Sequence, residues 1–227
     1  MKESESIQQE VEEIFILLSY ALVYDDWQDQ PQFKRRGYNV GALIVSPDNK
    51  PVYHGLNCID STNNVTQHGE IRAITEYLGQ GEQYNLAHHS IYVTLEPCIM
   101  CAGMITMASV KQVVYGQSDV HYSHAFERIS IDSTAIGGYA PYPRNVSVKS
   151  ADTVFCNELN RAYKKYLEVE NEKVLAKFLT STTAKEIFKA ATEAFLAFQP
   201  TYNANKQIQK EALKYYNNGR KQEKGKD

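Results

Sequence analysis

Two short motifs, well separated along the chain, carry side chains that can bind one metal ion. His68-Gly-Glu70 is followed by Pro97-Cys-Ile-Met-Cys101. Imidazole and thiolate groups are common zinc ligands, and three protein ligands leave one position of a tetrahedral ion open, as in catalytic rather than structural zinc sites. To use all three ligands, the fold must bring His68 beside a cysteine pair that is distant from it in the sequence.

The spacing within each motif favours such a site. Cys98 and Cys101 fall at the predicted start of a helix, where positions i and i+3 share one face, so both sulfur atoms can reach one ion. A helix N-terminus also stabilises thiolates. His68 begins the preceding predicted helix, and sites in α/β proteins commonly lie at strand ends. We therefore predict one Zn²⁺ per chain, bound by His68, Cys98 and Cys101.

Glu70 is the candidate for proton transfer, because it lies two residues from His68 and is not needed as a ligand. Bound Zn²⁺ lowers the pKa of its water from about 16 to about 7, and a nearby carboxylate can accept that proton and return it later. Each motif alone is weak evidence, since Cys-x-x-Cys is often structural or redox-active. The chain lacks the second Cys-x-x-Cys of a four-ligand zinc ribbon, so the combination predicts a hydrolytic zinc site.

Composition excludes several classes of protein. The 227 residues include only four cysteines, too few for a disulfide scaffold, so Cys58 and Cys156 are expected to be unpaired. The apolar stretch 14–24 is too short to span a bilayer and has acidic flanks, and no signal peptide is visible. We therefore expect a cytoplasmic protein that does not bind membranes.

The charge is unevenly distributed. The net charge of −3 argues against general affinity for nucleic acid, but residues 202–227 carry seven Lys/Arg and three Asp/Glu. This basic tail is either a solvated helix end or a contact for a phosphate backbone.

The hydrophobic pattern predicts a three-layer α/β domain at residues 1–168 and a helical extension at 169–227. A capping box at Ser6 predicts the first helix start, the loop 116–144 is long enough to carry small elements of its own, and the final ten residues are expected to be frayed. Strands are predicted at 40–46, 52–56, 90–94, 110–115 and 146–148. Helices are predicted at 6–24, 68–78, 97–108, 153–169, 170–178, 183–198 and 204–217.

The two motifs and their surroundings resemble the cytidine deaminase superfamily over residues 14–148. Thr94–Ile105 is most similar to bacterial-type tRNA adenosine deaminases and related free-base deaminases, and Val40–Val45 and Val113–Gly116 are similar to the flanking strands of that branch. The resemblance implies a five-stranded mixed sheet between helices, a nucleobase-containing substrate and a homodimer or higher oligomer. It also implies the zinc ligands proposed above, with Glu70 as the proton shuttle.

The resemblance further indicates substrate-binding residues. Asn57 matches the position that hydrogen-bonds the base, with an ordinary loop residue as the alternative, and Asp119 matches an aspartate of the tRNA enzymes. Phe126 is a candidate for a pocket wall, since aromatic rings stack on bases, although ordinary loop packing is the alternative. The Glu96 side chain is expected to cap the following helix rather than to be a second catalyst.

Two departures keep the substrate open. Gly69 replaces the usual Ala of the tRNA enzymes, as in fungal-type cytosine deaminases, and 120–126 lacks their Lys and Gly-Ala continuation. One hypothesis is deamination of adenosine in tRNA, favoured by Thr94–Ile105 and the basic tail. A second is deamination of a small free base, nucleoside or nucleotide, favoured by Gly69, the modest net charge and a C-terminal helix able to cover the pocket. A third is a non-catalytic zinc scaffold, which the presence of Glu70 disfavours.

Overall fold

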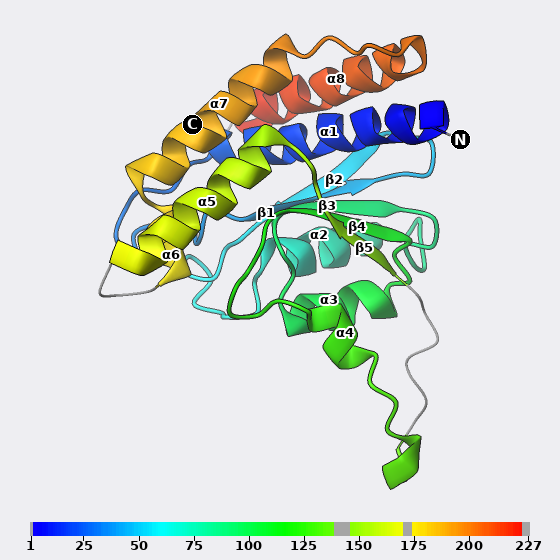
Figure 1. The fold of residues 1–227 in the computed structure, drawn as a ribbon, viewed down its shortest axis with the longest axis vertical. Coiled ribbons are helices and arrows are strands. Elements are labelled where there is room, and N and C mark those ends of the chain that lie inside the picture. Colours follow the sequence, from blue (N-terminus) through cyan, green and yellow to red (C-terminus); the bar gives the residue numbers. More distant parts are fainter. Residues whose placement is uncertain (1, 139–145, 170–173, 224–227) are drawn as a thin grey trace.

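A central sheet of five strands organises the chain (Figure 1). The computed structural model describes residues 2–138, 146–169 and 174–223. The strand order is β2-β1-β3-β4-β5; β1 is antiparallel to β2 and β3, whereas β3, β4 and β5 are parallel. The predicted mixed sheet is therefore confirmed. The strands are β1 (Gly41–Val45), β2 (Pro51–Leu56), β3 (Ser90–Leu95), β4 (Gln112–Gln117) and β5 (Ser147–Ser150).

Helices cover both faces of the sheet and give the predicted three layers (Figure 1). One layer consists of α2 (Gly69–Leu78), α3 (Ile99–Met107) and α4 (Ala125–Ile129). The other consists of α1 (Lys2–Asp25), α5 (Val154–Val169), α6 (Leu175–Leu179), α7 (Thr182–Ala197) and α8 (Lys206–Glu223). Two short 3₁₀ helices lie at Thr134–Ile136 and Asn203–Asn205. No helix in the described part of the chain is long and apolar enough to cross a membrane.

Several predicted boundaries were wrong. The first helix begins at Lys2 rather than at a Ser6 cap, because Glu3 and Glu5 in its first turn interact favourably with the helix dipole. The last helix continues to Glu223, so the prediction that the chain is frayed from residue 218 onward was wrong for residues 218–223. Residues 224–227 lie outside the described residues. The long loop does carry α4 and a 3₁₀ helix; its residues 139–144, and residues 170–173 of a predicted helix, also lie outside that range.

The central part of the α1 helix is buried on all sides. Five consecutive residues, Ile14 to Leu18, are at most 1% exposed. Only a stripe of a helix can face one layer, so a helix that is apolar all round needs cover on its outer side as well. That cover comes from α7 and α8, whose Phe188, Phe195 and Tyr216 belong to the same buried cluster as α1 (Figure 1). These C-terminal helices therefore complete a core within their own chain, while the predicted domain boundary after residue 168 stays a prediction.

Polar contacts also fix the C-terminal helices to the rest of the chain. The buried carboxylate of Glu10 accepts hydrogen bonds from the Thr201 amide and from the Asn205 Nδ2, both at 2.7 Å. His54 Nδ1 on β2 lies 2.9 Å from the Tyr215 hydroxyl on α8. Groups buried at this interface would lose these partners if α7 and α8 were detached.

A substitution at Phe188 tests whether α7 belongs to the main core. Its ring centroid lies 4.8 Å from that of Tyr20 and 5.2 Å from that of Trp27. We expect Phe188→Ala to lower the free energy of unfolding by about 3–5 kcal/mol, measured by denaturant titration with circular dichroism and Trp27 fluorescence. Leu196→Ala on the same helix, 46% exposed, should cost less than about 1 kcal/mol. Separate unfolding of α7 and α8, with the sheet unaffected, would contradict this account.

Candidate active site

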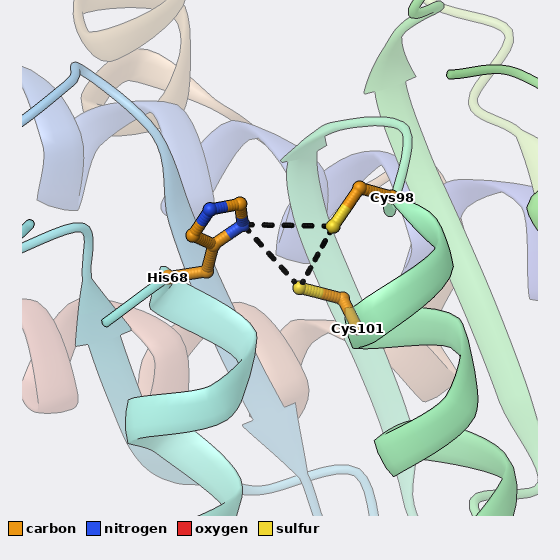
Figure 2. A group of neighbouring side chains, drawn as sticks. All are labelled: His68, Cys98 and Cys101. Atoms are coloured by element: carbon orange, nitrogen blue, oxygen red, sulfur yellow. Dashed lines mark hydrogen bonds between the residues drawn. The ribbon is translucent and has the colours of Figure 1, made fainter. Parts of the chain in front are cut away.

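The starts of two helices bring the predicted metal ligands together. His68 is the N-cap residue of α2 and Cys98 is the N-cap residue of α3, both with extended backbone. Cys101 follows on the first turn of α3. Figure 2 shows the three side chains converging between the two helix starts. In the described residues, these three form the only group of at least three metal-ligating side chains of this kind.

The distances among the three ligand atoms fit a zinc ion. His68 Nδ1 lies 3.7 Å from Cys98 Sγ and 3.5 Å from Cys101 Sγ, and the two sulfur atoms are 3.6 Å apart. With Zn–S bonds of about 2.3 Å and a Zn–N bond of about 2.0–2.1 Å, tetrahedral geometry places two sulfurs about 3.8 Å apart and sulfur and nitrogen about 3.6 Å apart. The cysteines are free rather than disulfide-bonded, so the donor set and its spacing both suit Zn²⁺.

The electrostatics of the triangle also favour a cation. The hydrogen bond between the two thiols lowers the pKa of Cys98 to about 4, and the nearby imidazole of His68 adds to this effect. The same hydrogen bond, together with burial, raises the pKa of Cys101. The hydrogen bond to Cys98 raises the pKa of His68. The Cys98 sulfur is therefore stabilised as a thiolate by the protons of its two neighbours. A bound metal ion would take the place of those protons.

Glu70 lies in the first turn of α2, two residues from His68, and is 3% exposed. Burial raises the pKa of its carboxyl group, which adjoins the Cys101 thiol. Its Oε2 is fully buried and has no hydrogen-bond partner among the described residues. Buried polar atoms are rarely left without a partner, so this oxygen is available to a group that binds at the site.

The close approach of α2 to the hairpin explains why glycine occupies position 69. A Cβ atom at Gly69 would lie 2.8 Å from the carbonyl oxygen of Gly55 on β2, and a Cβ at Gly55 would lie 2.4 Å from the carbonyl oxygen of Gly69. Backbone atoms cannot move aside as a flexible side chain can. Gly69 is therefore required for helix packing in this chain, and its presence says little about the substrate.

Asn57 follows the last residue of β2, and a backbone hydrogen bond links the loop after it to the segment just before His68. The next residue, Cys58, donates its amide to the Gln67 carbonyl oxygen at 2.9 Å, which brings Asn57 towards His68. Asn57 is 2% exposed, and its Oδ1 accepts the Tyr38 amide at 3.1 Å. No hydrogen bond of its Nδ2 is found among the described residues, so the amide nitrogen is the part of Asn57 that can contact a substrate.

Asp119 and Phe126 line a separate pocket of about 360 Å³ between α4 and the sheet. The residues around this pocket do not include the three metal ligands or Glu70. Asp119 Oδ1 accepts the amides of His121 and Tyr122 at 2.9 and 3.1 Å. The structure thus brings Asp119 and Phe126 together in one pocket wall, which is separate from the group formed by the three metal ligands.

Glu96 lies in the same wall and was incorrectly predicted to cap α3. The N-cap residue of α3 is Cys98, with no side-chain cap. The Glu96 carboxylate instead accepts the amides of Asp119 and His124, each at 3.1 Å. Sequence reasoning missed these contacts because the bonded residues lie far along the chain; the only local signal was a carboxylate next to Pro97.

Comparisons with known proteins agree with this fold and donor set. Residues 24–117 match the family described as "Cytidine and deoxycytidylate deaminase zinc-binding region". The chain is 34% identical over 110 residues to the tRNA-specific adenosine deaminase of Rickettsia felis, covering 48% of this chain and 76% of that protein. It is 40% identical over 93 residues to the enzyme of that name from Rickettsia bellii, covering 40% of this chain and 64% of that protein.

A solved structure from a study of A-to-I editing by tRNA:A34 deaminases is 30% identical, with 49% of this chain and 82% of that chain covered and a TM-score of 0.39.

An α/β sandwich with a His-Cys-Cys triangle at two helix starts defines a zinc-binding deaminase-like domain. From the shared sequence, the chain belongs to the cytidine deaminase superfamily. The chain spans 64% of the length of the Rickettsia bellii protein and 76% of the length of the Rickettsia felis protein.

Proposed function

We propose that the chain is a zinc-dependent hydrolytic deaminase of an amino-bearing nucleobase, most simply adenosine in tRNA. The observation that carries the proposal is the buried Glu70 carboxyl, with a free oxygen beside three side chains spaced for zinc. The tRNA substrate rests on the similarity to proteins named tRNA-specific adenosine deaminase. We further propose one Zn²⁺ per chain and, from the free cysteines, a reducing cytoplasmic location.

The reaction replaces an amino group by oxygen: the ring carbon gains a bond to a water-derived oxygen, and ammonia leaves. When bound by His68, Cys98 and Cys101, Zn²⁺ would make a water acidic enough to react at neutral pH. Glu70 accepts a proton at Oε2 and gives it to the ring nitrogen next to the reacting carbon. It then carries the second proton to the departing nitrogen. Burial, which raises the pKa of Glu70, suits a group that must hold a proton between these steps.

The proposed substrate contacts come from Asn57, Asp119 and Phe126. In this proposal the Asn57 Nδ2, which has no hydrogen bond among the described residues, donates one to an acceptor on the base. Asp119 and Phe126 contribute one polar and one aromatic group to the neighbouring wall. An aromatic face accepts any base, so Phe126 would add affinity without deciding which base reacts.

A small free base is the second candidate substrate. One argument for it, that a C-terminal helix could cover the pocket, is weaker in the folded chain. The C-terminal helices α7 and α8 lie in the α1 layer, on the opposite face of the sheet from α2 and α3 (Figure 1). A cover over the metal ligands by these helices therefore has no support. The same position also separates the described part of the basic tail from α2 and α3, so the tail does not favour RNA either.

Replacing Glu70 tests the proposed chemistry and separates an enzyme from a zinc scaffold. We expect Glu70→Gln to keep the wild-type zinc content and to lower deamination by at least about 10²-fold. Cys98→Ser, the matched control, should lose both zinc and activity. Zinc is measured by elemental analysis, and the products as inosine in bulk tRNA and as ammonia from free bases, nucleosides and nucleotides. Turnover by Glu70→Gln equal to the wild type would refute its role as the proton carrier.

We also propose that the chain forms a homodimer through the outer face of α3. Ile99 and Met107 are 51% and 58% exposed, and the space over Gly103 is open. Next to them, the apolar side chains of Ile74 and Met104 line a hollow between α2 and α3. Contiguous exposed apolar surface is typical of protein interfaces.

A charge on this face should therefore prevent dimer formation. We expect Met107→Glu to shift the protein from dimer to monomer, because burying an unpaired carboxylate is costly. Leu196→Glu, which places the same charge on partly exposed α7, should leave the dimer intact. Sedimentation velocity distinguishes these outcomes; a monomeric wild type would show that the interface does not exist.

A further inference from the structure

The loop that follows β4 is held mainly by side-chain oxygens rather than by backbone carbonyls. The five bonded amides belong to one short segment, residues 118–124. They are Ser118 to Asn160 Oδ1 at 2.8 Å, Asp119 to Glu96 Oε2 at 3.1 Å, His121 and Tyr122 to Asp119 Oδ1 at 2.9 and 3.1 Å, and His124 to Glu96 Oε1 at 3.1 Å. The conformation of this loop therefore depends on three side chains, of which only Asp119 is part of the loop.

Glu96 makes the contacts that close the loop. Its two carboxylate oxygens each accept one amide, from Asp119 and His124, which lie at opposite ends of the segment. Its own backbone N–H donates to the Gln117 carbonyl oxygen at 2.8 Å, at the last rung between β3 and β4. His124 has a φ of +59°, a left-handed conformation that a non-glycine residue adopts only at a cost. The bond to Glu96 helps to stabilise this conformation.

Glu96 is also close in sequence to the metal ligands. Pro97 and then Cys98 follow Glu96 directly, so Glu96 leads into the start of α3. Glu96, Asp119, His124 and Phe126 all line the pocket beside α4. Among the side chains that hold this loop, Glu96 is the one that links the pocket wall directly to the chain entering α3.

Glu96 is unsuited to the other roles that its position allows. It does not cap α3. It is also a poor proton carrier, because both of its oxygens already accept backbone amides, whereas Oε2 of Glu70 has no partner among the described residues. Charge-assisted bonds from two amides instead favour a fixed carboxylate.

We propose that Glu96 is a positioning residue, whose carboxylate holds the 118–126 wall in register with the metal-binding start of α3. The consequence for catalysis rests on the proposed function, but the contact itself does not. Removing the carboxylate should loosen the wall and weaken substrate binding, while the three metal ligands stay in place.

Amide hydrogen exchange tests the contact without a substrate. In Glu96→Ala, exchange at Asp119 and His124 should accelerate by about tenfold or more. Glu96→Gln keeps one carbonyl oxygen as an acceptor, so its exchange rates should be intermediate; this variant also carries the test if the alanine variant does not fold. Asp132→Ala is the matched control, because Asp132 accepts the Thr134 amide at 2.9 Å outside this pocket. It should change exchange at Thr134 and leave Asp119 and His124 unaffected.

Kinetics on the zinc-loaded full chain provides the second measurement. With wild-type zinc content, Glu96→Ala should raise KM by about tenfold or more and change kcat by less than about threefold, as expected when binding is lost uniformly. Unchanged exchange at Asp119 and His124, or loss of zinc, overturns the proposal. Faster exchange in a protein whose wild type deaminates nothing would refute the proposed function while supporting the contact.

Discussion

The structure depends on the meeting of two helix starts over one face of the sheet. The β1–β2 hairpin leads into α2, and β3 leads into α3, so His68 and Cys98 become equivalent N-cap residues on neighbouring helices. Helix N-termini stabilise negative charge, which suits the thiolates that we propose as metal ligands. The glycine pair at 55 and 69 allows α2 to approach the hairpin closely. A larger residue at either position would displace His68 from the sulfur atoms.

The remainder of the site is built by carboxylates with different environments. Glu70 is buried, has a raised pKa and has one free oxygen. Glu96, only a few residues from Cys98, is fully engaged by backbone amides. From this difference we propose proton transfer for the first and positioning of the pocket wall for the second. On the opposite layer, α7 and α8 contribute by covering α1, which supports the sheet that carries both helix starts.

Much of this arrangement could be predicted from the sequence. The i, i+3 spacing of Cys98 and Cys101 indicated a shared helix face, and the order of apolar segments indicated the layers. The contacts of Glu96 could not be predicted, because its partners lie more than twenty residues away and a backbone amide leaves no sequence signal. The reason for Gly69 was also hidden, since it depends on the distance between α2 and β2. The five apolar residues from Ile14 did contain a signal: they cannot all face one layer, and so they required the C-terminal helices.

The central claim concerns the atoms that surround the metal ion, and X-ray absorption at the zinc edge of the purified protein tests it most directly. The account predicts one zinc per chain with two sulfur ligands at about 2.3 Å, one imidazole nitrogen at about 2.0–2.1 Å and one further light atom in the open position. A site with four protein ligands, a site without sulfur, or well-folded protein that binds no zinc would contradict it.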